Sequence, residues 1–321
     1  SMKETGKTDI EEKKDTPILE FKDTSFVYHG ARKETIHPFD FAVKEGETIG
    51  VIGGTGSGKS TFVSLIARLY DVTSGRILYR GVDEKELKPE FVRGKIGFVP
   101  QKASLFEGSL RDNMKWGKED ATDEEIYQAL DIAQAREFVD QKEQGLDFRI
   151  EQNGGNLSGG QKQRLTIARA LVRKPEILIL DDSASALDFA TDARLRKAIK
   201  ENTDNMTVFL VSQRVSTIRN ADHILVLDDG KIAGIGTHLQ LLKENQVYKS
   251  AHHRWQERRH KIMKKDKKQK TLQRIMEYMK PYRFLIFASL VLAVISVALT
   301  LYVPILTGQG VDCIISKGNV D

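Results

Sequence analysis

Short apolar runs alternate with polar and glycine-rich stretches along most of the chain, a pattern typical of buried strands joined by helices. The runs predict strands over Ile18–Tyr28, Thr48–Ile52, Ile77–Tyr79, Lys95–Pro100, Ile177–Leu180, Thr207–Ser212 and His223–Leu227. Apolar positions at helical spacing predict helices after Thr61, between Asp123 and Phe138, and over Lys162–Val172. Strands that alternate with helices predict an α/β fold.

The glycine-rich stretch between the strand Thr48–Ile52 and the first predicted helix has a phosphate-binding pattern. Gly53–Thr61 reads Gly-Gly-Thr-Gly-Ser-Gly-Lys-Ser-Thr and fits G-x-x-x-x-G-K-[ST]. Glycine permits the backbone angles and the close approach that aim several N–H groups at one phosphate. Lys59 supplies a positive charge for the outer phosphates, and Ser60 a hydroxyl for Mg²⁺. The alternative is an ordinary glycine-rich turn, but the flanking strand and helix favour a phosphate loop.

Three further patterns place candidate chemistry at the ends of predicted elements. Asp181 and Asp182 follow an apolar strand, where a carboxylate beside a phosphate loop is expected to act on Mg²⁺. Ser158-Gly-Gly precedes the helix Lys162–Val172, so its bare N–H groups offer a second anion site, although a simple helix cap explains the same residues. Tyr28 is a candidate for stacking on a base, and the alternative is a core aromatic residue.

Charge and hydropathy divide the chain of 321 residues into two parts. Between Arg254 and Arg283 there are 12 Lys/Arg and 3 Asp/Glu, a local net charge of +9, whereas the whole chain carries +5. Phe284–Val303 is almost wholly apolar and long enough to cross a bilayer as a helix. Because basic residues before such a run hold that end on the cytoplasmic side, we interpret the basic tract as a membrane-orienting flank and expect no nucleic-acid partner.

Other features carry little chemistry. Cys313 is the single cysteine, so no disulfide within the chain is possible, and a reducing compartment fits. Residues 1–16 are predicted to be a solvated linker, and Ser1–Asp15 lacks the apolar core of a signal peptide. His252-His253 has no third metal ligand in view and is predicted to be solvated.

The ordered set of patterns resembles the ATP-binding domain of ATP-binding-cassette (ABC) transporters of the exporter type. The resemblance covers about Ile18 to Gln256. It rests on the phosphate loop, Phe98-Val-Pro-Gln101, Leu157-Ser-Gly-Gly-Gln161, Ile177-Leu-Ile-Leu-Asp181 and Ser185-Ala-Leu-Asp188. It implies a P-loop NTPase fold over residues 17–250, in which a RecA-like core carries an antiparallel β subdomain and an α-helical signature subdomain.

The tail resembles the start of an exporter's membrane domain. The resemblance implies a basic linker and elbow helix at 251–283, with the elbow over Leu272–Arg283, and a first transmembrane helix at 284–306. Residues 307–321 would begin the extracytoplasmic side. Since one helix cannot form a translocation path, we expect a fragment, either of a tandem polypeptide cut after its second membrane domain begins or of a junction between neighbouring subunits.

The resemblance implies that two such domains close head to tail around two molecules of ATP with Mg²⁺. Tyr28 would stack on adenine, Gln101 would sense the membrane domain, and Asp188 would reach across the seam. The phosphate-binding residues would be Gly53, Gly54, Thr55, Gly56, Ser57, Gly58, Lys59, Ser60 and Thr61. The metal ligands would be Ser60, Gln101 and Asp181. Ser158, Gly159, Gly160 and Gln161 would cap the γ-phosphate bound by the opposite subunit.

At three positions the chain departs from the family, which has Glu, His and Glu where this sequence has Asp182, Gln213 and Gln152. A general base must reach to within about 2.6–3.2 Å of its target, and Asp is one methylene shorter than Glu. Gln has no titratable proton. Because acid–base assistance is worth about 10²–10⁴ in rate, these departures predict a site that binds ATP and hydrolyses it slowly. The intact signature would complete an active partner site, as in heterodimeric exporters with one degenerate site.

The expected function is therefore that of a transport ATPase subunit at the cell membrane, with the ATP-binding domain on the cytoplasmic side and membrane domains as partners. A regulatory ATP-binding clamp without productive hydrolysis is the alternative. A DNA-repair or chromosome-maintenance ATPase is disfavoured, because no long heptad segment interrupts the domain.

Overall fold

The computed structural model describes residues 6–10, 15–203, 205–257 and 280–317. The chain divides into two units, Ser1–Trp255 and Gln256–Asp321. Each unit is described by itself.

A six-stranded sheet forms the centre of the first unit, in the order β12-β11-β3-β10-β9-β6. Only β12 is antiparallel to its neighbour; the other pairings are parallel. The strands are β3 (Thr48–Gly53), β6 (Ile96–Val99), β9 (Ile177–Asp181), β10 (Thr207–Val211), β11 (His223–Asp228) and β12 (Lys231–Gly236). The predicted α/β fold is confirmed, and the five parallel strands share one carboxyl edge.

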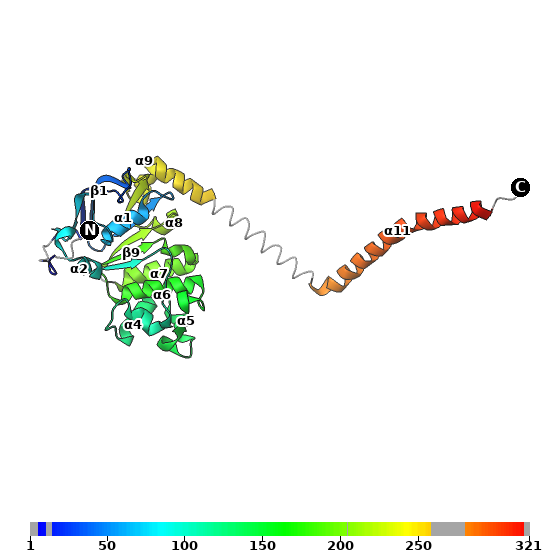
Figure 1. Cartoon of the computed structure of the whole chain (residues 1–321), viewed down its shortest axis with the longest axis horizontal. Helices are drawn as coiled ribbons and strands as arrows, with labels where there is room; N and C mark the ends of the chain where they lie inside the picture. The colour runs from blue at the N-terminus through cyan, green and yellow to red at the C-terminus, as the bar shows by residue number, and fades with distance from the viewer. Residues whose placement is uncertain (1–5, 11–14, 204, 258–279, 318–321) are drawn as a thin grey trace. The chain divides into compact units, whose positions relative to one another are not determined.

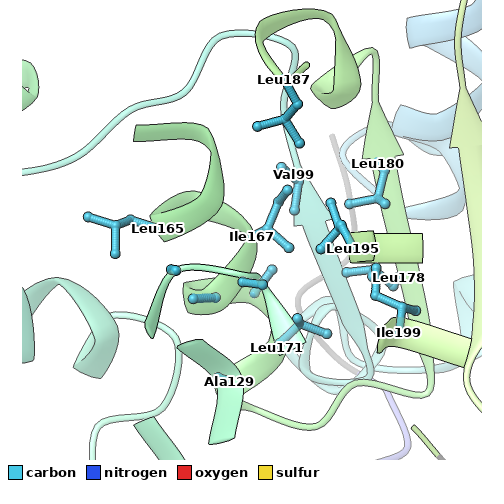
Figure 2. Close-up of a cluster of buried hydrophobic side chains, with 14 of the residues drawn as sticks. Val99, Ala129, Leu165, Ile167, Leu171, Leu178, Leu180, Leu187, Leu195 and Ile199 are labelled. Carbon is cyan, nitrogen blue, oxygen red and sulfur yellow. The ribbon is translucent and has the colours of Figure 1, made fainter. Parts of the chain in front are cut away.

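The parallel strands are apolar throughout because both faces of the sheet are buried. In β9, Ile177 and Ile179 point into one hydrophobic cluster, with side chains of α1 (Lys59–Ile66) and of the antiparallel sheet. Leu178 and Leu180 point into another. Figure 2 shows this second cluster, in which they meet Val99, Leu165, Ile167, Leu171, Leu195 and Ile199. Alternate side chains of one strand therefore serve two cores.

A four-stranded antiparallel sheet, in the order β2-β1-β4-β5, matches the expected β subdomain. Its strands are β1 (Leu19–Phe26), β2 (Ile36–Val43), β4 (Ser74–Tyr79) and β5 (Val82–Asp83). The apolar pattern did not predict β2, which contains Pro38. Proline cannot donate to a sheet ladder, and β2 tolerates it because it lies at the edge of the sheet.

Helices cover the central sheet and build the predicted α-helical subdomain (Figure 1). Beside α1 they are α2 (Pro89–Gly94), α3 (Leu110–Lys115), α4 (Asp123–Ile132), α5 (Arg136–Asp140), α6 (Gly159–Val172), α7 (Phe189–Asn202), α8 (Val215–Ile218) and α9 (His238–Glu244). Residues 246–257 are also helical. The short strands β7 (Gly108–Ser109) and β8 (Arg149–Ile150) pair beside α3. The single helix predicted between Asp123 and Phe138 is divided, because Gln134 adopts a left-handed backbone (φ 57°) between α4 and α5.

Part of the predicted N-terminal linker is docked on the first unit. Lys7 pairs in parallel with Leu87. Its N–H donates to the carbonyl of Glu86 at 2.8 Å, and its own carbonyl accepts from the N–H of Lys88 at 2.9 Å. Ile10 packs against the buried cluster beneath the antiparallel sheet. These contacts differ from the fully solvated segment that the polar composition predicts, because backbone groups pair whatever the side chains are.

Beyond residue 257, the described part of the second unit is a 3₁₀ turn over Lys280–Tyr282 and α11 (Arg283–Lys317). Among the described residues, Lys280–Gln309 is the one helical stretch long and apolar enough to cross a membrane, with a mean hydropathy of 2.7 in its most apolar window. The helix continues through Pro304, which removes one helical hydrogen bond without ending it. The predicted bounds of the membrane span, 284–306, stay a prediction. Most of the predicted elbow helix and of the basic tract lies outside the described residues.

Candidate nucleotide-binding site

The predicted phosphate loop connects the carboxyl end of β3 to the N-terminus of α1. Gly56 and Gly58 have φ values of 79° and 95°, which favour glycine. A Cβ at Gly53 would lie 2.3 Å from the carbonyl oxygen of Leu227, so close packing requires glycine there as well. Gly54 and Gly56 face open space, where a Cβ would meet nothing within 4 Å. Within the described ranges no side chain caps α1, so its first N–H groups are available to an anion.

Lys59 points back over this loop. Its Nζ donates to the carbonyl oxygens of Gly53 at 2.9 Å and Gly54 at 2.6 Å. Burial lowers the pKa of Lys59, and the negative charges of Asp181 and Asp182 partly oppose that shift. The ammonium group is thus held among acceptors at the mouth of the loop, where a phosphate could replace the carbonyls as its partner.

Asp181, the last residue of β9, lies beside the loop. The residue is 7% exposed, and burial raises its pKa, while a hydrogen bond from Ser60 and the charge of Lys59 lower it. One buried carboxylate next to one hydroxyl fits Mg²⁺, which prefers oxygen ligands and keeps phosphate oxygens and water for its other positions. Within the part of the chain that the structure describes, no group of three or more His, Cys, Asp or Glu could hold a metal.

Asp182 turns away from the strand with a left-handed backbone (φ 44°), and its N–H donates to the carbonyl of Val211 at 2.9 Å. The amide of Gln101 donates to its carboxylate, with 3.4 Å between Nε2 and Oδ2. The pKa of Asp182 is raised, chiefly by burial and also by the negative charge of Asp181. The positive charges of Arg214 and Lys59 act in the opposite direction. Arg214 was not singled out from the sequence, although a basic residue next to Gln213 was a readable signal.

Gln213 is exposed on the loop after β10. Because β3, β6, β9 and β10 are parallel neighbours, the phosphate loop, Gln101, Asp182 and Gln213 all follow the carboxyl ends of strands in the same sheet. Gln152, the third departure from the family pattern, is exposed in a turn within the segment between β8 and α6.

Tyr28 follows β1 and reaches the start of α1. Its hydroxyl lies 3.0 Å from the hydroxyl of Thr61, and the residue is 36% exposed. The structure thus brings Tyr28 to the phosphate loop and leaves part of it open to solvent, which a wholly buried core aromatic would not be.

The signature residues begin α6. The Ser158 hydroxyl accepts from the N–H of Gln161 at 3.3 Å, and the Gln161 amide oxygen accepts from the N–H of Ser158 at 2.9 Å, a capping box. Gly159 faces open space, with no atom within 4 Å of a Cβ placed there. No hydrogen bond among the described residues joins this motif to the phosphate loop. Both readings of the sequence, cap and anion site, are compatible with this geometry.

Asp188 caps α7. Its carboxylate accepts from the N–H groups of Ala190 at 3.0 Å and Thr191 at 2.9 Å, and from the Thr191 hydroxyl at 2.8 Å. These hydrogen bonds lower the pKa of Asp188. Its predicted contact across a dimer seam stays a prediction.

Residues 36–185 match the family model described as "ABC transporter". The chain contains an ABC transporter ATP-binding domain. This domain is similar to the ABC transporter ATP-binding protein YfiB of Bacillus subtilis (strain 168), with 47% identity over 234 residues, which are 72% of this chain and 40% of that protein. It is also similar to the ATP-dependent lipid A-core flippase of Vibrio vulnificus (strain CMCP6), with 39% identity over 251 residues, 78% of this chain and 43% of that protein.

Among solved structures, the ATP-binding domain resembles that of a bacterial Atm1-family ABC exporter with ATP bound. The TM-score is 0.71 and the identity 35%, and the match covers 75% of this chain and 42% of that chain. The chain therefore spans about two fifths of the length of these relatives. The domain is an ABC transporter ATPase domain of the exporter type, with the expected P-loop fold.

Proposed function

We propose that the chain is the ATP-binding part of an ABC exporter, and that its domain binds MgATP at the loop Gly53–Thr61. The observation that carries this proposal is the gathering of Lys59, Ser60 and Asp181 at the mouth of a loop with uncapped N–H groups. Lys59 would bind the outer phosphates, and Ser60 and Asp181 would hold Mg²⁺, which supplies positive charge to offset the phosphates. Tyr28 would stack on the base.

The domain works with a second ATP-binding domain, packed head to tail. The placement of Ser158 supports this part of the proposal, since no hydrogen bond within the described part of the chain connects the helix that it begins to the phosphate loop. The N–H groups of Gly159 and Gly160 are free of the capping box and would meet the γ-phosphate held by the partner domain.

Hydrolysis at the chain's own loop is slow. Asp182 is shorter than the Glu of the family, and its carboxylate is already engaged by Gln101. Gln213 can donate a hydrogen bond to a phosphate, but its amide has no titratable proton and no positively charged form. A water molecule near the γ-phosphate therefore lacks a well-placed base, while binding through Lys59 is unaffected.

The apolar helix α11 would place the domain at the cytoplasmic face of the cell membrane, beside membrane domains that carry the substrate path. The relatives support this assignment, since they include a lipid A-core flippase and an ABC exporter. A regulatory ATP-binding clamp is the second candidate. The engaged Asp182 carboxylate favours it, because this site could then hold ATP closed without turning it over.

Single-turnover hydrolysis of radiolabelled ATP by the whole chain tests the proposal. The unmodified chain should show almost no turnover, and the Asp182→Glu, Gln213→His double variant should gain turnover. Asp182→Asn is the matched control and should stay at the level of the unmodified chain. Robust hydrolysis by the unmodified chain would contradict the slow-site assignment, and unchanged ATP affinity in Lys59→Ala would contradict ATP binding itself.

A further inference from the structure

The ring of Tyr28 is held from three directions. It makes edge-to-face contacts with Phe26, with ring centroids 4.8 Å apart at 84°, and with Tyr70, with centroids 5.3 Å apart at 86°. Its hydroxyl is anchored on Thr61, 3.0 Å away. Aromatic pairs at these separations and angles attract one another through their charge distributions. Tyr28 is therefore restrained although it is partly exposed.

The buried side chain of Arg68 fixes the turn that carries Tyr70. The chain leaves α1 through Arg68, whose backbone is left-handed (φ 46°) and whose side chain is 1% exposed. The Arg68 guanidinium donates to the carboxylate of Asp71 at 3.1 Å and to the carbonyl of Leu87 at 2.5 Å. Tyr70 lies inside this turn, between Arg68 and Asp71. Its ring also packs against Phe26, with centroids 5.5 Å apart, so it is placed firmly although it is 43% exposed.

Apart from Phe26 in β1, the residues that restrain Tyr28 lie at opposite ends of one helix. Thr61 lies in the first turn of α1, and Tyr70 follows the turn that ends it. The N-terminus of the same helix carries the phosphate loop. The position of Tyr28 relative to the phosphate loop is consequently set by α1 and by the anchored turn that follows it.

We propose that Tyr70 is a positioning residue for nucleotide binding, which holds Tyr28 in the orientation in which it stacks on the base. The inference rests on the proposed binding of ATP at this loop. A ring that is already oriented loses less conformational freedom when the ligand binds, so the affinity is higher than with a mobile tyrosine. Tyr70 acts through Tyr28 and need not touch the nucleotide.

The test measures displacement of a fluorescent ATP analogue by MgATP from the full chain. Tyr70→Leu should weaken MgATP binding about twofold to tenfold, the effect of one aromatic pair, and Tyr70→Phe should bind like the unmodified chain because it keeps the ring. Tyr28→Leu should weaken binding at least as much. In the Tyr28→Leu background, Tyr70→Leu should have no further effect, since its only route to the base is gone.

Magnesium tripolyphosphate, which has phosphates but no base, is the second probe. It should displace the analogue equally well from all the tyrosine variants and poorly from Lys59→Ala, a result that a general loss of structure would not produce. Tyr70→Met keeps apolar bulk without a ring and replaces Tyr70→Leu if that variant does not fold.

The two proposals fail in different ways. If Lys59→Ala leaves MgATP affinity unchanged, the proposed function is wrong. If Lys59→Ala and Tyr28→Leu weaken binding but Tyr70→Leu does not, the positioning role is wrong. It is also wrong if Tyr70→Leu weakens binding equally with and without Tyr28, because Tyr70 would then act directly on the base.

Discussion

The amide of Gln101 donates a hydrogen bond to the carboxylate of Asp182, with Nε2 and Oδ2 3.4 Å apart. The two residues are 81 positions apart in the chain and meet because β6 and β9 are parallel neighbours. The contact is long for a hydrogen bond, so it restrains Asp182 without locking it in place. It joins two residues that the sequence singles out separately.

We expect Gln101→Ala to raise the pKa of Asp182. Burial already raises this pKa, and an amide donor favours the ionised carboxylate, so its removal moves the pKa further upward. Titration of carboxyl-labelled aspartate by NMR, with Asp182→Asn to assign the signal, measures the effect. Gln152→Ala replaces another exposed glutamine and should leave the pKa where it is. A Gln101→Ala chain in which Asp182 titrates as before would show that the contact has no electrostatic consequence.

Lys59→Ala should weaken MgATP binding about 10- to 100-fold, the scale of one lost hydrogen bond to a charged group. The carbonyl oxygens of Gly53 and Gly54, which Lys59 contacts, cannot take over the phosphate. Equilibrium binding to the whole chain is the measurement. Lys243→Ala removes an exposed lysine near the end of α9 and serves as the control, with affinity expected to be unchanged.

Asp188→Ala should lower the melting temperature by about 2–4 °C, because α7 loses its N-cap. Hydrogen bonds lower the folded-state pKa of Asp188, so their stabilisation is present above its unfolded pKa and is lost as the pH falls through the folded value. Asp188→Asn keeps an oxygen acceptor and should retain most of the stability at neutral pH. Thermal unfolding at several pH values measures both effects, and equal melting temperatures for Asp188→Ala and the unmodified chain would exclude a capping role.

Glu84→Gln should stabilise the domain at neutral pH, because burial disfavours the ionised carboxyl group, whereas the amide stays neutral. Glu84 is 4% exposed, and its Oε1 has no hydrogen-bond partner among the residues that the structure describes. Burial raises its pKa well above the ordinary value; Arg68 opposes this, and Asp83 and Asp71 add to it. Because the pKa of Glu84 is higher in the folded state, the protonated side chain contributes most to folding stability at pH values below the unfolded-state pKa. That contribution is lost as the pH rises through the folded-state pKa.

The stabilisation by Glu84→Gln should therefore be clear at pH 8 and nearly absent at pH 4. Urea unfolding at the two values measures it. Glu90→Gln changes an exposed glutamate of α2 and is the matched control, with little effect expected at either pH. Equal stabilisation at both values would mean that the effect is not one of ionisation.

The strands of the parallel sheet and β1 could be predicted because burial on one or both faces leaves a local signal, an apolar run. The helix α7 could not, because it is mostly polar. Only a few of its positions, among them Leu195 and Ile199 one turn apart, reach the core. The break between α4 and α5 was missed because it depends on the left-handed backbone of Gln134, and glutamine, unlike glycine or asparagine, does not favour that conformation. Local sequence patterns thus identify strands with a continuous apolar run. They miss a helix that buries only a few side chains and a break that depends on the backbone of one residue.

The sequence by itself determined the chemistry: the phosphate loop, the two aspartates, the residues at the family's catalytic positions and the apolar segment are all readable where function requires particular residue types at fixed spacing. Which of these residues contact one another was decided only by the tertiary structure. Gln101 with Asp182, and Tyr28 with Thr61 and Tyr70, depend on which strands become neighbours and on how the turn after α1 is anchored. Those arrangements arise from packing across the whole domain, and no local stretch of sequence encodes them.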